Sequence, residues 1–120
     1  MRAIRRAVEL GDGWYPFFAP GGVSATARTT EMSGEQDLVD GINYMREHCE
    51  KVGRETPPTV CTSSFPTPGE GWNAQAIIDR IGRFKELGIS GSATAIEGNT
   101  LDEWCDNARR YSEDVLSKVD

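Results

Sequence analysis

The sequence lacks the features that several specialised classes of protein require. Its 120 residues include only three cysteines and one histidine, and no apolar run reaches the roughly 18–20 residues of a membrane-spanning helix. Acidic residues outnumber basic ones by 19 to 13, which gives a net charge of −6 and no basic surface for phosphates. No apolar segment follows the first arginines, so we expect no secretory signal. The composition predicts a single globular domain that binds neither nucleic acid nor membranes.

The three cysteines favour neither a disulfide framework nor a metal site. Cys49, Cys61 and Cys105 are far apart and odd in number, whereas disulfide frameworks use even, dense sets and zinc sites use close pairs. We therefore expect buried, reduced thiols in a reducing, cytoplasmic compartment, and no metal.

The chain does contain a regular alternation of helical and extended patterns. These patterns predict helices over residues 2–10, 35–52 and 73–87 and a last helix from 101, with strands over 14–18, 59–65 and 89–96. Pro16 should keep the first strand brief, Asn73 is a candidate N-cap, and Thr100–Glu103 matches a capping box. This alternation predicts an α/β fold with a parallel sheet and right-handed connections.

Each expected helix carries apolar residues at helical spacing, which we expect to face the core. They are Ile4, Ala7 and Val8; Leu38, Val39, Ile42, Met45, Cys49 and Val52; Ala74, Ile77, Ile78, Ile81 and Phe84; and Leu101, Trp104, Cys105, Ala108, Tyr111, Val115 and Val119. Gly41 lies beside the second stripe, where a missing side chain permits close packing. Gly11 should end the first helix in the left-handed conformation, and Gly53 and Gly88 should stop the next two.

The connections that follow the strands are long and rich in chain breakers. Residues 19–34 and 66–72 both contain glycine and proline clusters, and both follow the carboxyl end of an expected strand. Because ligands bind at that edge in open α/β sheets and β/α barrels alike, we expect the functional site there.

Four segments resemble the luciferase-like monooxygenase family. They are R-R-A-V-E-L-G-D-G-W-Y-P (5–16), K-V-G-R-E-T-P-P-T-V (51–60), R-I-G-R-F-K-E-L-G-I (80–89) and E-W-C-D-N-A-R-R-Y-S-E-D-V (103–115). They span nearly the whole chain in the family's order. The resemblance implies a (β/α)8 TIM barrel that acts as an oxidoreductase or monooxygenase on a small-molecule substrate. It implies reduced FMN, which activates dioxygen, or the deazaflavin coenzyme F-420, which transfers hydride, as the cofactor.

The resemblance covers only part of such a barrel, which typically needs about 250 residues. The chain is similar to the last three strands and their helices, so we expect residues 1–120 to be a C-terminal fragment of the barrel domain. In the family, a glycine-rich phosphate turn precedes the R-R-A helix, and Met1 stands where that turn would end. We expect the isolated chain to have little activity, and to close against a missing N-terminal half or a second copy. The alternative is a non-catalytic half-barrel module for binding or assembly that pairs with another chain.

Two charged residues are candidates for the cofactor site that the resemblance implies. Arg2 would help to neutralise a cofactor phosphate; in the alternative, Arg5 or Arg6 pairs with an acid such as Asp12 and the other arginines are solvated. Glu97, expected at the end of the last strand, would hydrogen-bond substrate or cofactor, or is simply a polar residue that leaves the sheet.

Three residues with rings have both a functional and a structural interpretation. Trp14 would stack on the flavin ring or, as is more common, pack in the core. Trp72 lies in a glycine-rich connection and would contact the ligand or anchor the loop. His48, the one histidine, is expected at a solvated helix position rather than in catalysis. No residue is assigned a catalytic role.

Overall fold

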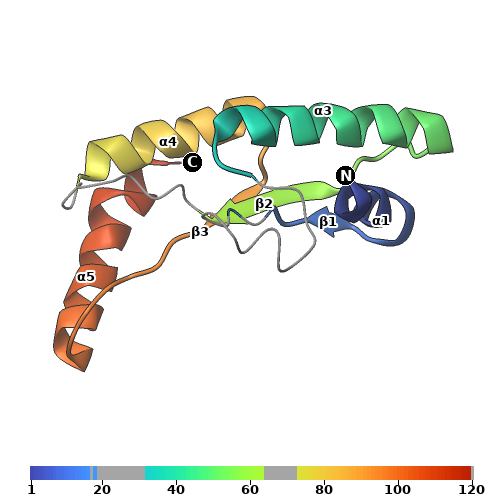
Figure 1. Ribbon diagram of the computed structural model, residues 1–120. Coiled ribbons are helices and arrows are strands. Elements are labelled where there is room, and N and C mark those ends of the chain that lie inside the picture. The colour runs from blue at the N-terminus through green and yellow to red at the C-terminus, as the bar shows by residue number, and fades with distance from the viewer. Residues whose placement is uncertain (17, 19–31, 64–72, 120) are drawn as a thin grey trace.

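The computed structural model describes residues 1–16, 18, 32–63 and 73–119, and its elements alternate as expected (Figure 1). They are α1 (Arg2–Leu10), β1 (Gly13–Trp14), α3 (Glu35–Val52), β2 (Thr59–Ser63), α4 (Ala74–Leu87), β3 (Gly91–Ala93), α5 (Leu101–Asp114) and a 3-10 turn, η1 (Leu116–Lys118). The expected bounds of the first two helices are confirmed. The third begins at Ala74 because Asn73 is its N-cap and accepts a hydrogen bond from the Ala76 backbone N–H.

The three strands form one parallel sheet in the order β1-β2-β3. Trp14 pairs with Val60, and Cys61 pairs with Gly91. The parallel arrangement is confirmed, and β1 is brief as expected, with two residues. The expected length of the third strand is wrong, because β3 has three residues and not the eight of 89–96. Pro16 offers no N–H for a longer β1, and β3 has a strand partner on one side only.

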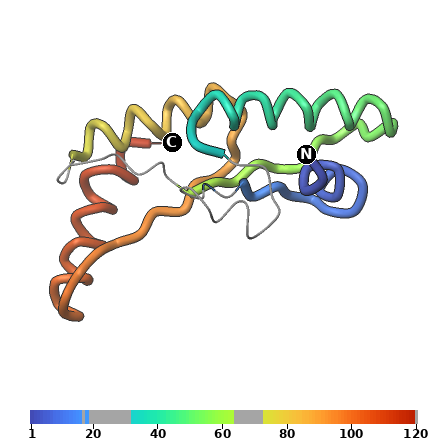
Figure 2. The backbone as a smooth tube through the Cα atoms, in the orientation of Figure 1, coloured from blue at the N-terminus to red at the C-terminus, as the bar shows by residue number. Residues whose placement is uncertain are grey.

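The core lies between the sheet and the helices α1, α3 and α4. Figures 1 and 2 show α3 and α4 on the same face of the sheet, with α1 beneath the C-terminal half of α3, at the amino ends of the strands. The buried cluster contains Ile4, Val8, Trp14, Leu38, Ile42, Met45, Cys49, Val60, Phe84 and Ile89. The expected stripes of the first two helices are thus largely confirmed, but Val52 is exposed and Phe84 is the only fully buried residue of α4.

Gly41 permits the close packing that the sequence indicated. A Cβ at this position would lie less than 3.0 Å from Trp14 Cη2, and two further carbons of the indole ring lie 3.3 Å away. The indole therefore rests directly on the backbone of α3, which explains why a glycine occupies the middle of a helix that favours other residues.

The helix ends follow the expected chemistry at two of three glycines. Gly53 and Gly88 are left-handed, with φ of 72° and 82°. The expectation for Gly11 is wrong: its φ is −132° and its backbone is extended. The guanidinium of Arg54 takes over the capping role there, because Nη1 lies 2.7 Å from the carbonyl oxygen of Val8 and 2.6 Å from that of Gly11. The end of α1 needs no left-handed residue when a cation satisfies its carbonyls.

The last helix departs most from expectation. No residue of α5 is buried, and Leu101 and Trp104 are 76% and 46% exposed, so the expected core stripe of this helix is wrong apart from Val115, which follows α5 and is buried. Figure 2 shows α5 leaning away from the sheet. The molecule is accordingly elongated, with extents of 49 × 35 × 23 Å and a radius of gyration of 16.4 Å, against about 13.6 Å for a compact domain of this length.

The cysteines are all free thiols. Cys49 is buried as expected, whereas Cys61 and Cys105 are half-buried. None of the helices in the described ranges is long and apolar enough to span a bilayer.

Candidate functional site

The candidate site is the edge of the sheet at the carboxyl ends of the strands. Because the three strands are parallel, the connections that follow them start from this same edge. Most of the first two connections, with residues 19–31 and 64–72, lies outside the described residues. The third connection, residues 94–100, is described in full, and it carries Glu97.

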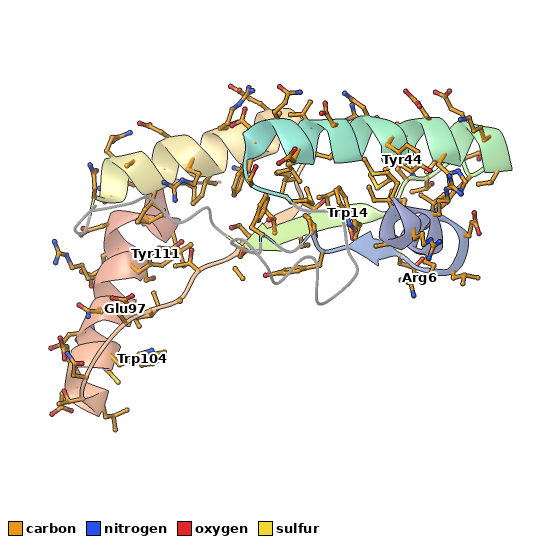
Figure 3. All side chains as sticks on the ribbon, viewed as in Figure 1. Arg6, Trp14, Tyr44, Glu97, Trp104 and Tyr111 are labelled. Carbon is orange, nitrogen blue, oxygen red and sulfur yellow. The ribbon has the colours of Figure 1, made fainter. Side chains whose placement is uncertain are left out.

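Glu97 lies in an extended segment four residues beyond the end of β3, not at the end of the strand as expected. Its backbone carbonyl accepts a hydrogen bond from Asn107 Nδ2 at 2.9 Å, which holds this segment alongside α5 (Figure 3). Its carboxylate is exposed and has no hydrogen-bond or ion-pair partner within the described part of the chain. Glu97 is therefore an uncommitted acid beside α5, in the connection that leads away from the carboxyl edge of the sheet (Figure 3).

The segment after Glu97 is fixed by the start of α5. Thr100 Oγ1 accepts a hydrogen bond from the Glu103 backbone N–H at 3.2 Å, so the expected threonine cap is confirmed. The reciprocal bond differs from the expectation, since Glu103 Oε2 accepts from the backbone N–H of Asn99 at 2.8 Å. Because the carboxylates of Glu97 and Glu103 both belong to this part of the chain, the start of α5 is a poor place for a phosphate.

Arg2 and Glu97 are not brought together. Arg2 is the first residue of α1 and is exposed, and α1 lies at the amino ends of the strands, whereas Glu97 follows the carboxyl end of β3 (Figures 1 and 3). The expected pairing of Arg5 or Arg6 with Asp12 does not occur. Arg5 Nε instead donates to Tyr44 Oη at 2.6 Å, which raises the pKa of the arginine, and Asp12 lies 3.6 Å from Arg54.

The two candidate tryptophans have different outcomes. Trp14 is 7% exposed and packs on Gly41 in the core, so the described residues give its ring a packing partner and leave little of it accessible. Trp72 lies outside the described residues, and its contact with a ligand stays a prediction.

His48 is not solvated, contrary to the expectation. Its Nε2 lies 2.6 Å from Glu9 Oε1, and its ring stacks on Tyr44 with 6.2 Å between centroids and 2° between planes. Together with the Arg5–Tyr44 bond, these contacts join α1 to α3 on the side of the molecule away from Glu97 (Figure 3). The Glu9–His48 pair is thus a polar contact that holds the two helices together. Sequence reasoning missed it because Glu9 and His48 are 39 residues apart.

A second polar bridge joins α3 to α4. Arg83 Nη2 and Nε lie 2.7 and 3.0 Å from Glu35 Oε1, and Nη1 lies 2.9 Å from Glu86 Oε2. The hydrogen bonds that Arg83 donates to Glu35, and then the one that it donates to Glu86, raise the pKa of the arginine. Both bridges hold neighbouring helices together, α1 with α3 and α3 with α4.

The described residues contain no cluster of three or more histidine, cysteine, aspartate or glutamate side chains that could hold a metal ion. Comparison of the chain with protein-family models, with curated proteins and with solved structures found no match. The chain's own residues and the order of its strands and helices therefore carry what can be inferred about its function.

Proposed function

We propose that this chain forms part of an oxidoreductase of the luciferase-like class, in which further β/α units complete a (β/α)8 barrel. The observation that carries the proposal is the parallel register of β1, β2 and β3, each followed by a helix. This is the repeating unit of a β/α barrel, and the four segments that resemble the family fall in the matching order along it. The three free thiols favour a reducing, cytoplasmic location.

The carboxyl edge of the sheet is the proposed place for reduced deazaflavin F-420 or FMN and for a small-molecule substrate. When bound, such a cofactor supplies the hydride or the activated oxygen, and the protein supplies position and a dry pocket. Glu97 fits the ring or the substrate, because a free carboxylate accepts hydrogen bonds from ring N–H or hydroxyl groups. It does not fit the phosphate, which it would repel. A phosphate contact by Arg2, at the other end of the strands, stays a prediction.

Nuclear magnetic resonance titration of the 13.2 kDa chain tests this proposal. Oxidised FMN or F-420 is added to 15N-labelled protein at up to about 5 mM, a range that detects weak ligands. We expect amide shifts to gather on Ser63 and residues 94–100, and Glu97→Gln to reduce them. Glu113→Gln is the matched control, since Glu113 is an exposed acid at the other end of α5. Shifts confined to α1 and α3, or no shifts, would refute a cofactor site at this edge.

The second candidate function is a non-catalytic module that assembles with another chain. It is favoured by one specific observation, the exposed apolar residues of α5 in a chain whose β3, among the described residues, pairs with β2 alone. The two candidates differ in their ligand, because an assembly module need not bind a flavin.

A further inference from the structure

The β3–α5 arm, residues 91–119, carries apolar side chains that the described part of the chain leaves exposed. The exposed side chains of Leu101 and Trp104 lie one turn apart on α5, and the half-buried Ala108 and Tyr111 continue the same face. An amphipathic helix in a single globular domain normally turns such a face to the core. Exposed apolar side chains gathered on one face mark a surface that another element covers.

Contacts within the arm hold its extended segment against α5, so the arm is an ordered unit. Residues 94–98 run along α5, where Asn107 Nδ2 donates to the Glu97 carbonyl and Tyr111 Oη lies 3.5 Å from Thr94 Oγ1. A Cβ at Gly98 would lie 2.6 Å from the Trp104 backbone nitrogen, which shows how closely the segment follows the helix. The arm is thus a preformed unit joined to the sheet through β3.

The place that α5 would occupy is present in the same chain. In parallel β/α units, the helix after a strand packs back on the sheet beside the preceding helix. For α5 this place is beside α4 and over β3. Ile77, Ile78 and Ile81 of α4 are only half-buried, and α5 approaches α4 at its C-terminal end alone (Figure 1). The chain therefore contains both an apolar helix and an apolar acceptor that this helix does not fill.

The chain exposes more area than a compact monomer of its mass, which leaves room for a large interface. The chain exposes 8181 Å², against about 6,400 Å² for a compact monomer of this mass. The excess, about 1,800 Å² per chain or about 3,500 Å² for two, falls within the range of obligate dimers, about 2,000–5,000 Å².

We infer that α5 is an exchange arm that docks beside α4 of a second copy of this chain. Because each copy carries one arm and one acceptor, two copies satisfy each other in a closed two-fold dimer. The hinge is the junction at which β3 ends, between Ala93 and Thr94, because the segment that follows is held against α5. This inference names the partner for the assembly function proposed above, and it is independent of the cofactor proposal because it concerns association and not flavin.

The first test is the molar mass in solution, measured by size-exclusion chromatography with light scattering from about 1 to 500 μM. We expect about 26 kDa, twice the 13.2 kDa of the chain. Leu101→Asp should raise the dissociation constant by about 100-fold or more, while α5 itself is kept because an acid in the first turn of a helix is favourable. Leu10→Asp, at a leucine that is 84% exposed on α1, is the matched control and should leave the mass unchanged.

The second test distinguishes arm exchange from any other dimer. Equal amounts of 14N- and 15N-labelled chain are mixed, re-equilibrated and cross-linked with a carbodiimide, and links between Lys85 of α4 and an α5 carboxylate are analysed by mass spectrometry. Arm exchange predicts mixed-isotope pairs. Pairs within one isotope only, a monomer at every concentration, or a dimer that Leu101→Asp leaves intact would each overturn the inference. A monomer that still shows flavin shifts at residues 94–100 would leave the cofactor proposal standing.

Discussion

The contact between Trp14 and Gly41 predicts opposite effects of the same substitution at two helix positions. Replacing glycine by alanine inside a helix stabilises it by about 1 kcal/mol where the methyl group finds room. Gly82 of α4 has no atom within 4 Å of an added Cβ. At Gly41 the added carbon lies less than 3.0 Å from the indole ring, well inside the contact distance of about 3.5–4.0 Å between carbons. Either the ring or α3 must then move, and overpacking of this kind costs about 1–3 kcal/mol.

We therefore expect Gly82→Ala to raise the free energy of unfolding by about 1 kcal/mol. The free energy of unfolding of Gly41→Ala should be about 1–3 kcal/mol lower than that of Gly82→Ala. Urea denaturation, followed by the helix signal in circular dichroism at about 222 nm, measures both free energies of unfolding. The near-ultraviolet spectrum should change for Gly41→Ala alone, because its tryptophan moves. Equal stabilisation by both substitutions would show that Trp14 does not rest on α3, and would return the residue to the list of ligand-facing candidates.

Three further predictions concern helix ends. Arg54→Lys keeps the charge but loses the planar guanidinium, whose Nη1 donates to the carbonyls of Val8 and Gly11 while its Nε donates to that of Thr56. We therefore expect a loss of about 2 kcal/mol in urea denaturation; a cost no larger than that of the exposed Arg109→Lys would contradict it. The backbone N–H and then the hydroxyl of Ser33 lower the pKa of Asp37 below its ordinary 3.8, so its stabilisation is complete above that pH and is lost as the pH falls through the lower folded value. Asp37→Asn should flatten the stability curve between about pH 4 and pH 2, and an unchanged curve would exclude this role. Asn73→Ala should cost about 1 kcal/mol through the lost cap in thermal denaturation, whereas an equal loss for Asn43→Ala, inside α3, would mean that capping is not the cause.

Helix bounds could be predicted because their signals are local. Gly53 and Gly88 adopt the left-handed conformation that ends α3 and α4, and Asn73 and Thr100 cap the helices that follow them. Each signal acts within one turn of the helix, so a single sequence contains it.

Strand lengths and the burial of α5 depend on partners that local patterns do not encode. The stripe from Leu101 to Val115 shows that α5 is amphipathic, but not what covers it. The spacing of small residues after Ile89 favours an extended chain, yet β3 pairs only over Gly91–Ala93 because its length is set by the strand beside it. Both departures from expectation arise from tertiary contacts. They fall on β3 and α5, the elements of the proposed exchange arm.

The candidate site was predictable as an edge of the sheet but not as a set of contacts. The order of strands and helices places Glu97 in the connection after β3, but four residues beyond the strand end where it was expected. The separation of Arg2 from Glu97 and the pairing of Glu9 with His48 across 39 residues arise from the packing of α1 on α3, for which no short motif exists.

The guanidinium that closes α1 has a consequence for the order in which the chain folds. The helix has nine residues and no side-chain cap at its start, and so short a helix is marginal in water by itself. The donors for its last carbonyls come 43 and 46 residues later in the sequence. During folding α1 must therefore wait for α3 and the turn after it, so α1 is secured later than the helix it packs against.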